Sequence, residues 1–108
     1  MTLSDLRMIL MQAGIPAEHY KARLIQFPYI IYKETAFSYD YAGGREWRKV
    51  TRVSVDHFTK TEFDPTLELL ERVLLKNKIG FTGVVVWYEA DEIVHTNIEL
   101  SIAEDLTI

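Results

Sequence analysis

The sequence predicts a single α+β domain over residues 1–108, with two helices packed on one face of a four-stranded, mixed or antiparallel sheet. The first observation is that the period of the apolar residues switches from two to about 3.6 at Asp64-Pro65, as a strand passes into a helix. The second is that the order helix–strand–strand occurs twice. The third is composition, because 108 residues with 48% hydrophobic and 26% charged side chains correspond to one ordinary domain with one core.

The first helix is expected from about Leu3 to Ala13, where apolar residues recur at helical spacing. Thr2 and Asp5 resemble a capping box at its start. Gly14 favours a left-handed cap at its end. The segment after this helix has no clear period, so we expect it to be irregular as far as the next strand. The irregular segment is expected over residues 17–26 and the strand over residues 29–32.

Residues 36–48 are expected to form a long hairpin arm between the first two strands, with a Gly-Gly pair as a tight connection. A long two-stranded tip outside a core is marginal in water. The aromatic residues Phe37, Tyr39 and Tyr41 allow two interpretations. They face the core of an ordinary hairpin, or they belong to an arm that orders against a neighbouring subunit, since aromatic residues are enriched in interface cores.

The strand after the arm, residues 47–58, alternates between apolar and polar side chains in its middle. We expect Val53 and Val55 to face the core and Arg52, Ser54 and Asp56 to face water, which is typical of a half-buried strand.

The second helix is expected to start with Asp64 as its N-cap and Pro65 at its first position, and to end between Asn77 and Gly80. Its buried stripe should consist of Leu67, Leu70, Val73 and Leu74. Two further strands follow, over about residues 84–89 and 95–102, and residues 104–108 are expected to form a C-terminal tail.

Composition and charge exclude several classes of function. The formal net charge is −4 without a basic block, so a nucleic acid is not expected as a specific ligand. The chain has no cysteine, which excludes disulfides, thiolate nucleophiles and cysteine metal sites. The first residues are too polar for a signal peptide and no apolar run reaches membrane-spanning length, so we expect a soluble, cytoplasmic protein without a membrane partner.

The sequence contains no phosphate-binding glycine loop and no zinc motif, and we expect neither cofactor, metal nor catalytic residue. His57 and His95 could meet on adjacent strands, although strand parity puts Asp56 and His57 on opposite faces. An enzyme that uses His57 or His95 is therefore a minor alternative. The basic residues near the arm are interpreted as a charged sheet edge or an interface rim, and the acidic residues of the last turn as solvated. These residues are Arg45, Arg48, Lys49 and Arg52, and Glu89, Asp91 and Glu92.

Four segments resemble, in order, a family of small siphophage and prophage proteins known as minor capsid, tail-terminator or tail-completion proteins. They are LSDLRMILMQAGIPAEHY, FPYIIYKE, KVTRVSVDHFTKTEFDPTLELLERVL and IGFTGVVVWYEADEIVHTNIELSI. The resemblance covers nearly the whole chain and depends on order and spacing, because no segment contains a catalytic residue. Two departures are His57, where the family has an apolar residue, and SYDYAGGRE, where it has an asparagine-rich loop.

This resemblance implies a non-enzymatic virion protein that forms a ring, often a hexamer, at the end of the tail tube. It implies the tail tube, the head-completion or connector proteins and other copies of the chain as partners. It also implies a place at the head–tail interface of the virion, after a period in the host cytoplasm. The alternative is a small intracellular protein-binding or regulatory domain. The interface residues that we predict are Tyr39, Tyr41, Gly43, Gly44, Arg45 and Trp47.

Overall fold

The computed structural model describes residues 1–21, 26–42, 46–61, 64–88 and 91–107. The elements within these ranges are α1 (Leu3–Met11), β1 (Ala17–His19), β2 (Tyr29–Ala42), β3 (Glu46–Thr59), α2 (Pro65–Lys76), β4 (Phe81–Tyr88) and β5 (Ile93–Thr107). The strands form a mixed sheet in the order β1-β2-β3-β5-β4. β1 is parallel to β2, and the other neighbours are antiparallel.

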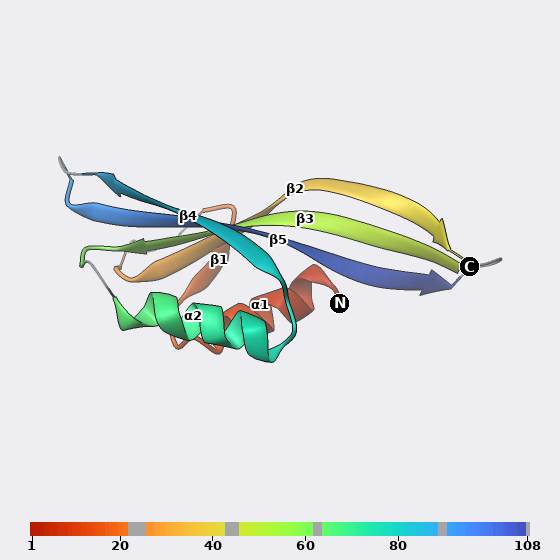
Figure 1. Cartoon of the computed structure of the whole chain (residues 1–108), viewed down its shortest axis with the longest axis horizontal. Helices are drawn as coiled ribbons and strands as arrows, with labels where there is room; N and C mark the ends of the chain where they lie inside the picture. Colours follow the sequence, from red (N-terminus) through yellow and green to blue (C-terminus); the bar gives the residue numbers. More distant parts are fainter. Residues whose placement is uncertain (22–25, 43–45, 62–63, 89–90, 108) are drawn as a thin grey trace.

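Both helices lie on the same face of this sheet (Figure 1), which confirms the predicted α+β class and the single helical layer. The core forms where the helix stripes contact the inward residues of the central strands. Leu6, Leu10, Leu70 and Leu74 are fully buried, and so are Val53 and Val55 of β3. The helix-facing alternation of β3 was therefore predicted correctly.

The starts of both helices also follow the predicted capping chemistry. Thr2 and Asp5 form a capping box, with Thr2 Oγ1 accepting from the amide of Asp5 and Asp5 Oδ2 accepting from the amide of Thr2. Asp64 caps α2, and Pro65 occupies the first turn, where a missing amide proton is tolerated. The first helix ends at Met11, two residues before the predicted Ala13.

The prediction of four strands was wrong, because residues 17–19 of the segment expected to be irregular form β1. Hydrogen bonds to its neighbour β2 determine this strand, because its own residues show no strand pattern. The amide of Ile30 donates to the carbonyl of Pro16 at 2.8 Å, and the amide of Tyr20 donates to the carbonyl of Tyr32 at 3.1 Å. A three-residue strand is too short to show a period, so tertiary pairing decides its structure.

The predicted C-terminal tail was wrong as well. β5 continues to Thr107 and pairs with β3 as far as Glu46. The charged residues Glu104 and Asp105 are compatible with this strand, because charges are common on the free edge of a sheet. As a result, the arm has three strands, β2, β3 and β5, and is not a two-stranded hairpin.

Ser54 and Asp56 are buried, contrary to the prediction that they face water, whereas Arg52 is exposed. Neighbouring polar side chains on β5 cover both groups. Asn97 Nδ2 donates to Ser54 Oγ and to Asp56 Oδ1, at 2.8 Å each. His95 Nε2 lies 2.7 Å from Asp56 Oδ1. On the sheet face opposite the helices, a hydrogen-bond network therefore covers Ser54 and Asp56.

The molecule is elongated because its strands are much longer than its helices. The 9 and 12 residues of α1 and α2 span about 14 and 18 Å. The 14 residues of β3 span about 48 Å. The radius of gyration is 15.2 Å, compared with about 13 Å for a compact chain of this size. β2, β3 and β5 therefore extend well beyond the helical layer (Figure 1).

The N-cap of α2 is also the point at which the helix is fixed to the end of β3. The Asp64 carboxylate accepts from the amide and hydroxyl of Thr66 and from the hydroxyls of Thr59 and Thr61. Burial by itself would raise the pKa of Asp64, but these hydrogen bonds together lower the pKa to about 2.

We expect Asp64→Ala to lower the free energy of unfolding by about 1 kcal/mol at pH 7, because the cap of α2 is lost. Asp64→Asn should lower it less, since asparagine also caps helices. The lowered pKa means that the contribution of Asp64 is complete above pH 4 and is lost as the pH falls towards 2. Urea unfolding of the three proteins at pH 7 and pH 3 measures both effects. Equal stability of wild type and Asp64→Ala at pH 7 would contradict this role.

Candidate interaction surface

The three-stranded arm has one aromatic face. Side chains opposite each other in antiparallel strands share a face and alternate along each strand. Tyr41 lies opposite Trp47, and Tyr39 lies opposite Lys49. Trp47 and Lys49 have the parity of the buried Val53, so these side chains are on the helix side of the sheet. Of the helical layer, only Met1 and Leu3 at the start of α1 lie beside this face, where they line a shallow cavity with Phe37 and Lys49. The rest of the arm extends beyond the helices (Figure 1).

The exposed fractions of these aromatic side chains test the first interpretation of the arm. They are 64% for Phe37, 50% for Tyr39, 56% for Tyr41 and 36% for Trp47. The interpretation that they face the core of an ordinary hairpin is therefore wrong. We call these four residues the aromatic row. Gly43, Gly44 and Arg45, which we also predicted as interface residues, lie outside the described residues.

Contacts within the arm hold the aromatic row in place. The rings of Tyr41 and Trp47 pack edge to face with centroids 5.0 Å apart. Lys49 Nζ lies 5.1 Å from the Phe37 ring centroid and 5.8 Å from that of Tyr39, within cation–π range. The row is therefore an ordered surface on a paired sheet before any partner binds.

A β-bulge places the aromatic row on the helix side. The register of β2 shifts between Glu34, which lies opposite Val53, and Ala36, which lies opposite Arg52. Thr35 is the additional residue. In β2, even-numbered residues such as Ile30 face the helices before the bulge, and odd-numbered residues such as Tyr39 do so after it. The sequence alone does not reveal this change of parity, because Tyr29–Tyr32 is apolar at both even and odd positions.

A second exposed apolar surface, which sequence reasoning missed, is strand β4. It is an edge strand, paired with β5 on one side only. Five consecutive apolar side chains are exposed between 38% and 63%. These are Val84, Val85, Val86, Trp87 and Tyr88. Because consecutive residues alternate between faces, the strand is exposed on both faces of the sheet as well as along its edge.

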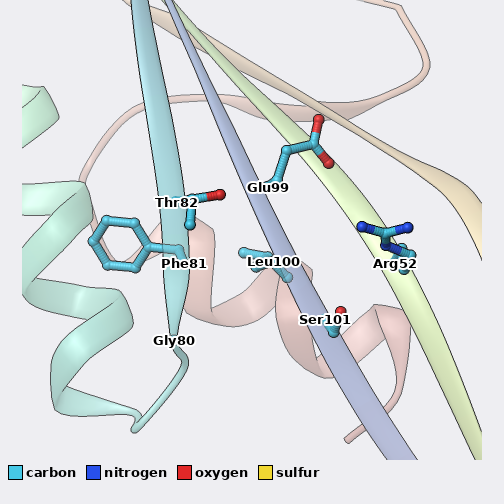
Figure 2. Close-up of a pocket in the computed structure, with 7 residues that line it drawn as sticks. All are labelled: Arg52, Gly80, Phe81, Thr82, Glu99, Leu100 and Ser101. Carbon is cyan, nitrogen blue, oxygen red and sulfur yellow. The ribbon is translucent and has the colours of Figure 1, made fainter.

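A shallow cavity of about 300 Å³ lies where β4 begins beside β5 (Figure 2). Arg52, Thr82 and Glu99 project on the sheet face opposite the helices, while Phe81 points away from them. Phe81 is the first residue of β4 and lies opposite Leu100, so β5 has no described neighbour on this side after Leu100. The cavity lies at this point, where the free edge of β5 begins. The remaining lining residues are Gly80, Leu100 and Ser101.

The two strand histidines lie on opposite faces of the sheet and do not meet. His95 contacts Asp56 on the open face, and its ring stacks on Phe58 with centroids 4.5 Å apart. His57 is fully buried on the helix side, where Nε2 lies 2.7 Å from Thr66 Oγ1. Among the residues that the structure describes, no group of three or more histidine, cysteine or acidic residues could hold a metal ion.

The protonation of His57 is constrained by its neighbours. Thr66 donates its hydroxyl proton to Asp64, so it accepts a hydrogen bond from His57 Nε2. His57 Nδ1 is buried without a hydrogen-bond partner. Burial lowers the pKa of His57 below its ordinary value of 6.5, and the negative charge of Asp64 opposes this shift.

The chain matches no model of a known protein family and no curated protein. No helix in the described part of the chain is long and apolar enough to cross a membrane.

We expect the protein to lose stability as the pH falls from 6.5 towards 5, because the unfolded chain takes up a proton at His57 before the folded chain does. His57→Leu should reduce this loss. His19→Gln, which changes an exposed histidine, should retain it. Thermal unfolding at several pH values measures the difference, and an identical pH dependence of wild type and His57→Leu would contradict it.

Proposed function

We propose that the protein is a non-enzymatic phage structural protein that assembles into a ring, ends the tail tube and joins the tail to the head connector. The observation that carries the proposal is the exposed aromatic row on the three-stranded arm. The ordered resemblance of four segments to tail-terminator and tail-completion proteins supports the same function. The proposed location is the head–tail interface of the virion.

The size of the aromatic row supports a role in protein contacts. Four rings that are between one third and two thirds exposed leave on the order of 400 Å² of aromatic surface in water. The largest apolar patch of an ordinary monomer is of this size and often has a function. Aromatic residues are also the commonest anchors of protein interfaces, because they bury a large area at a small cost in conformational entropy.

The structure of the arm favours assembly without a large ordering cost. β3 is paired on both sides along the whole arm, with β2 and with β5. Binding that uses a surface already in its bound conformation loses less conformational entropy. We therefore propose that the arm enters the assembly as a preformed ribbon and does not fold on contact.

A second candidate is a small protein-binding or regulatory domain that adds an extended peptide to the free edge of β4. The observation that favours it is the unpaired edge of β4 with its exposed apolar side chains. Strand addition to an open edge is a common mode of peptide recognition. Binding of a soluble bacterial protein, without any ring or tail-tube complex, would favour this candidate.

We expect Tyr39→Ser/Tyr41→Ser to abolish ring formation and attachment to tail tubes while the monomer keeps its melting temperature within a few degrees. Both side chains are about half exposed, so their removal costs little in the monomer. A matched control is Ser38→Ala/Asp40→Ala, which changes the opposite face of the same strand. Electron microscopy of each protein, alone and with terminator-free tail tubes of the same phage, is the measurement.

Two results would contradict the proposal. One is that wild-type protein neither forms rings nor binds the ends of tail tubes. The other is that phage tails assembled without the protein join normally to capsids.

A further inference from the structure

The sheet has one unprotected edge among its described strands, and it is β4. Proteins usually protect edges with lysine, proline, bulges or charged residues. β4 contains no charged residue and no proline. The free edge of β5 carries Glu104 and Asp105. The opposite edge is covered by β1 at Ile30–Tyr32 only, and beyond β1 it carries Lys33, Glu34, Asp40 and a β-bulge. A partner that covers an edge of this sheet is therefore expected at β4.

β4 and the aromatic row lie at opposite ends of the molecule. The C-terminal end of β4 and the tip of the arm point in opposite directions along the longest axis (Figure 1), which extends 53 Å. No single copy can bring these two surfaces together. A contact between them has to join two copies.

We propose that the aromatic row of one copy packs against β4 of the next copy, and that this contact closes the ring. The inference rests on the proposed ring-forming function and names the two surfaces that would meet in it. Each copy then uses its arm at one interface and its β4 at the other. A contact of two different patches is the type that closes into a ring, whereas a twofold contact of one patch with itself gives a dimer.

The dimensions of the two surfaces match. Phe37–Tyr41 and Val84–Tyr88 are both five-residue strand segments, so each is about 17 Å long. The exposed part of the β4 side chains amounts to on the order of 300 Å². One type of contact would use the aromatic row and one face of β4 in every copy, whereas an arm–arm or β4–β4 dimer would leave one of the two surfaces unused.

The areas also indicate how strong a single contact is. The two surfaces together expose on the order of 700 Å² of apolar side chain, of which a contact on one face of β4 covers only a part, and stable complexes bury at least about 1,000 Å² in total. Flanking backbone and polar groups must supply the remainder. A pair of copies is therefore weakly bound, and the complete ring, in which every copy has two contacts, is much more stable than an open pair.

The absence of cysteine from the chain makes the contact directly testable with single cysteines. Tyr39→Cys protein is mixed with Val85→Cys protein and oxidised, and disulfide-linked dimers are identified by mass spectrometry. We expect the mixed dimer to form several-fold more than either homodimer. Ser38→Cys, on the other arm face, and Lys76→Cys, on α2, are the controls and should give the background yield. A dominant Tyr39→Cys homodimer, a dominant Val85→Cys homodimer or only background cross-linking would overturn the proposal.

A second measurement uses two variants, each of which has one of the two surfaces blocked. Tyr39→Ser/Tyr41→Ser blocks the aromatic row and leaves β4 unchanged. Val85→Glu blocks β4 and leaves the arm unchanged. Each variant should be monomeric by sedimentation at high concentration, and their mixture should form a one-to-one dimer but no ring. Self-association of either variant, or no association of the mixture, would overturn the head-to-tail contact. Matching circular dichroism spectra and melting temperatures establish that both variants are folded.

These experiments separate the inference from the proposed function. Rings that bind tail tubes but give no Tyr39→Cys to Val85→Cys link would overturn the contact and leave the function standing. A link together with rings that ignore tail tubes would support the contact and contradict the tail function.

Discussion

The difference in length between helices and strands determines the architecture of this protein. Leu6, Leu10, Leu70 and Leu74 can cover only the part of the sheet that lies within reach of two short helices. There, Val53 and Val55 are completely buried. Beyond it, the same face of the same strands continues with aromatic side chains and without a cover (Figure 1). The arm is thus an extension of the core sheet, and its apolar face is the continuation of a core face.

The parts of the fold that could be predicted from the sequence are those whose signals are local. Asp64 and Pro65 mark the start of α2, because capping depends on residues within one turn. The inward direction of Val53 and Val55 follows from alternation along one strand. β1 and the last residues of β5 could not be predicted, because both are strands only through hydrogen bonds to a distant segment. The burial of Asp56 depends in the same way on Asn97 and His95 of another strand.

Three of the six predicted interface residues are exposed in the structure, and the interface itself stays a prediction. Tyr39, Tyr41 and Trp47 stood out because a cluster of aromatic residues beside a tight turn has no nearby helix to cover it. The position of the row on the helix side depends on the bulge at Thr35, and a bulge is visible in the sequence only as a break in parity. Because Tyr29–Tyr32 is apolar at both parities, that break cannot be read from the residues before the bulge.

The exposed surface of β4 was missed for a different reason. A short strand that is apolar at both parities is the pattern of a strand buried on both faces, which is common in the centre of a sheet. Val84–Tyr88 has this pattern but lies at an edge, with both faces open to water. Such a conflict between sequence and environment is expected at functional sites, where local rules are broken for a reason outside the monomer. Strand β4 therefore has the sequence of an interior strand at an edge position, and this is why we propose that another copy covers it.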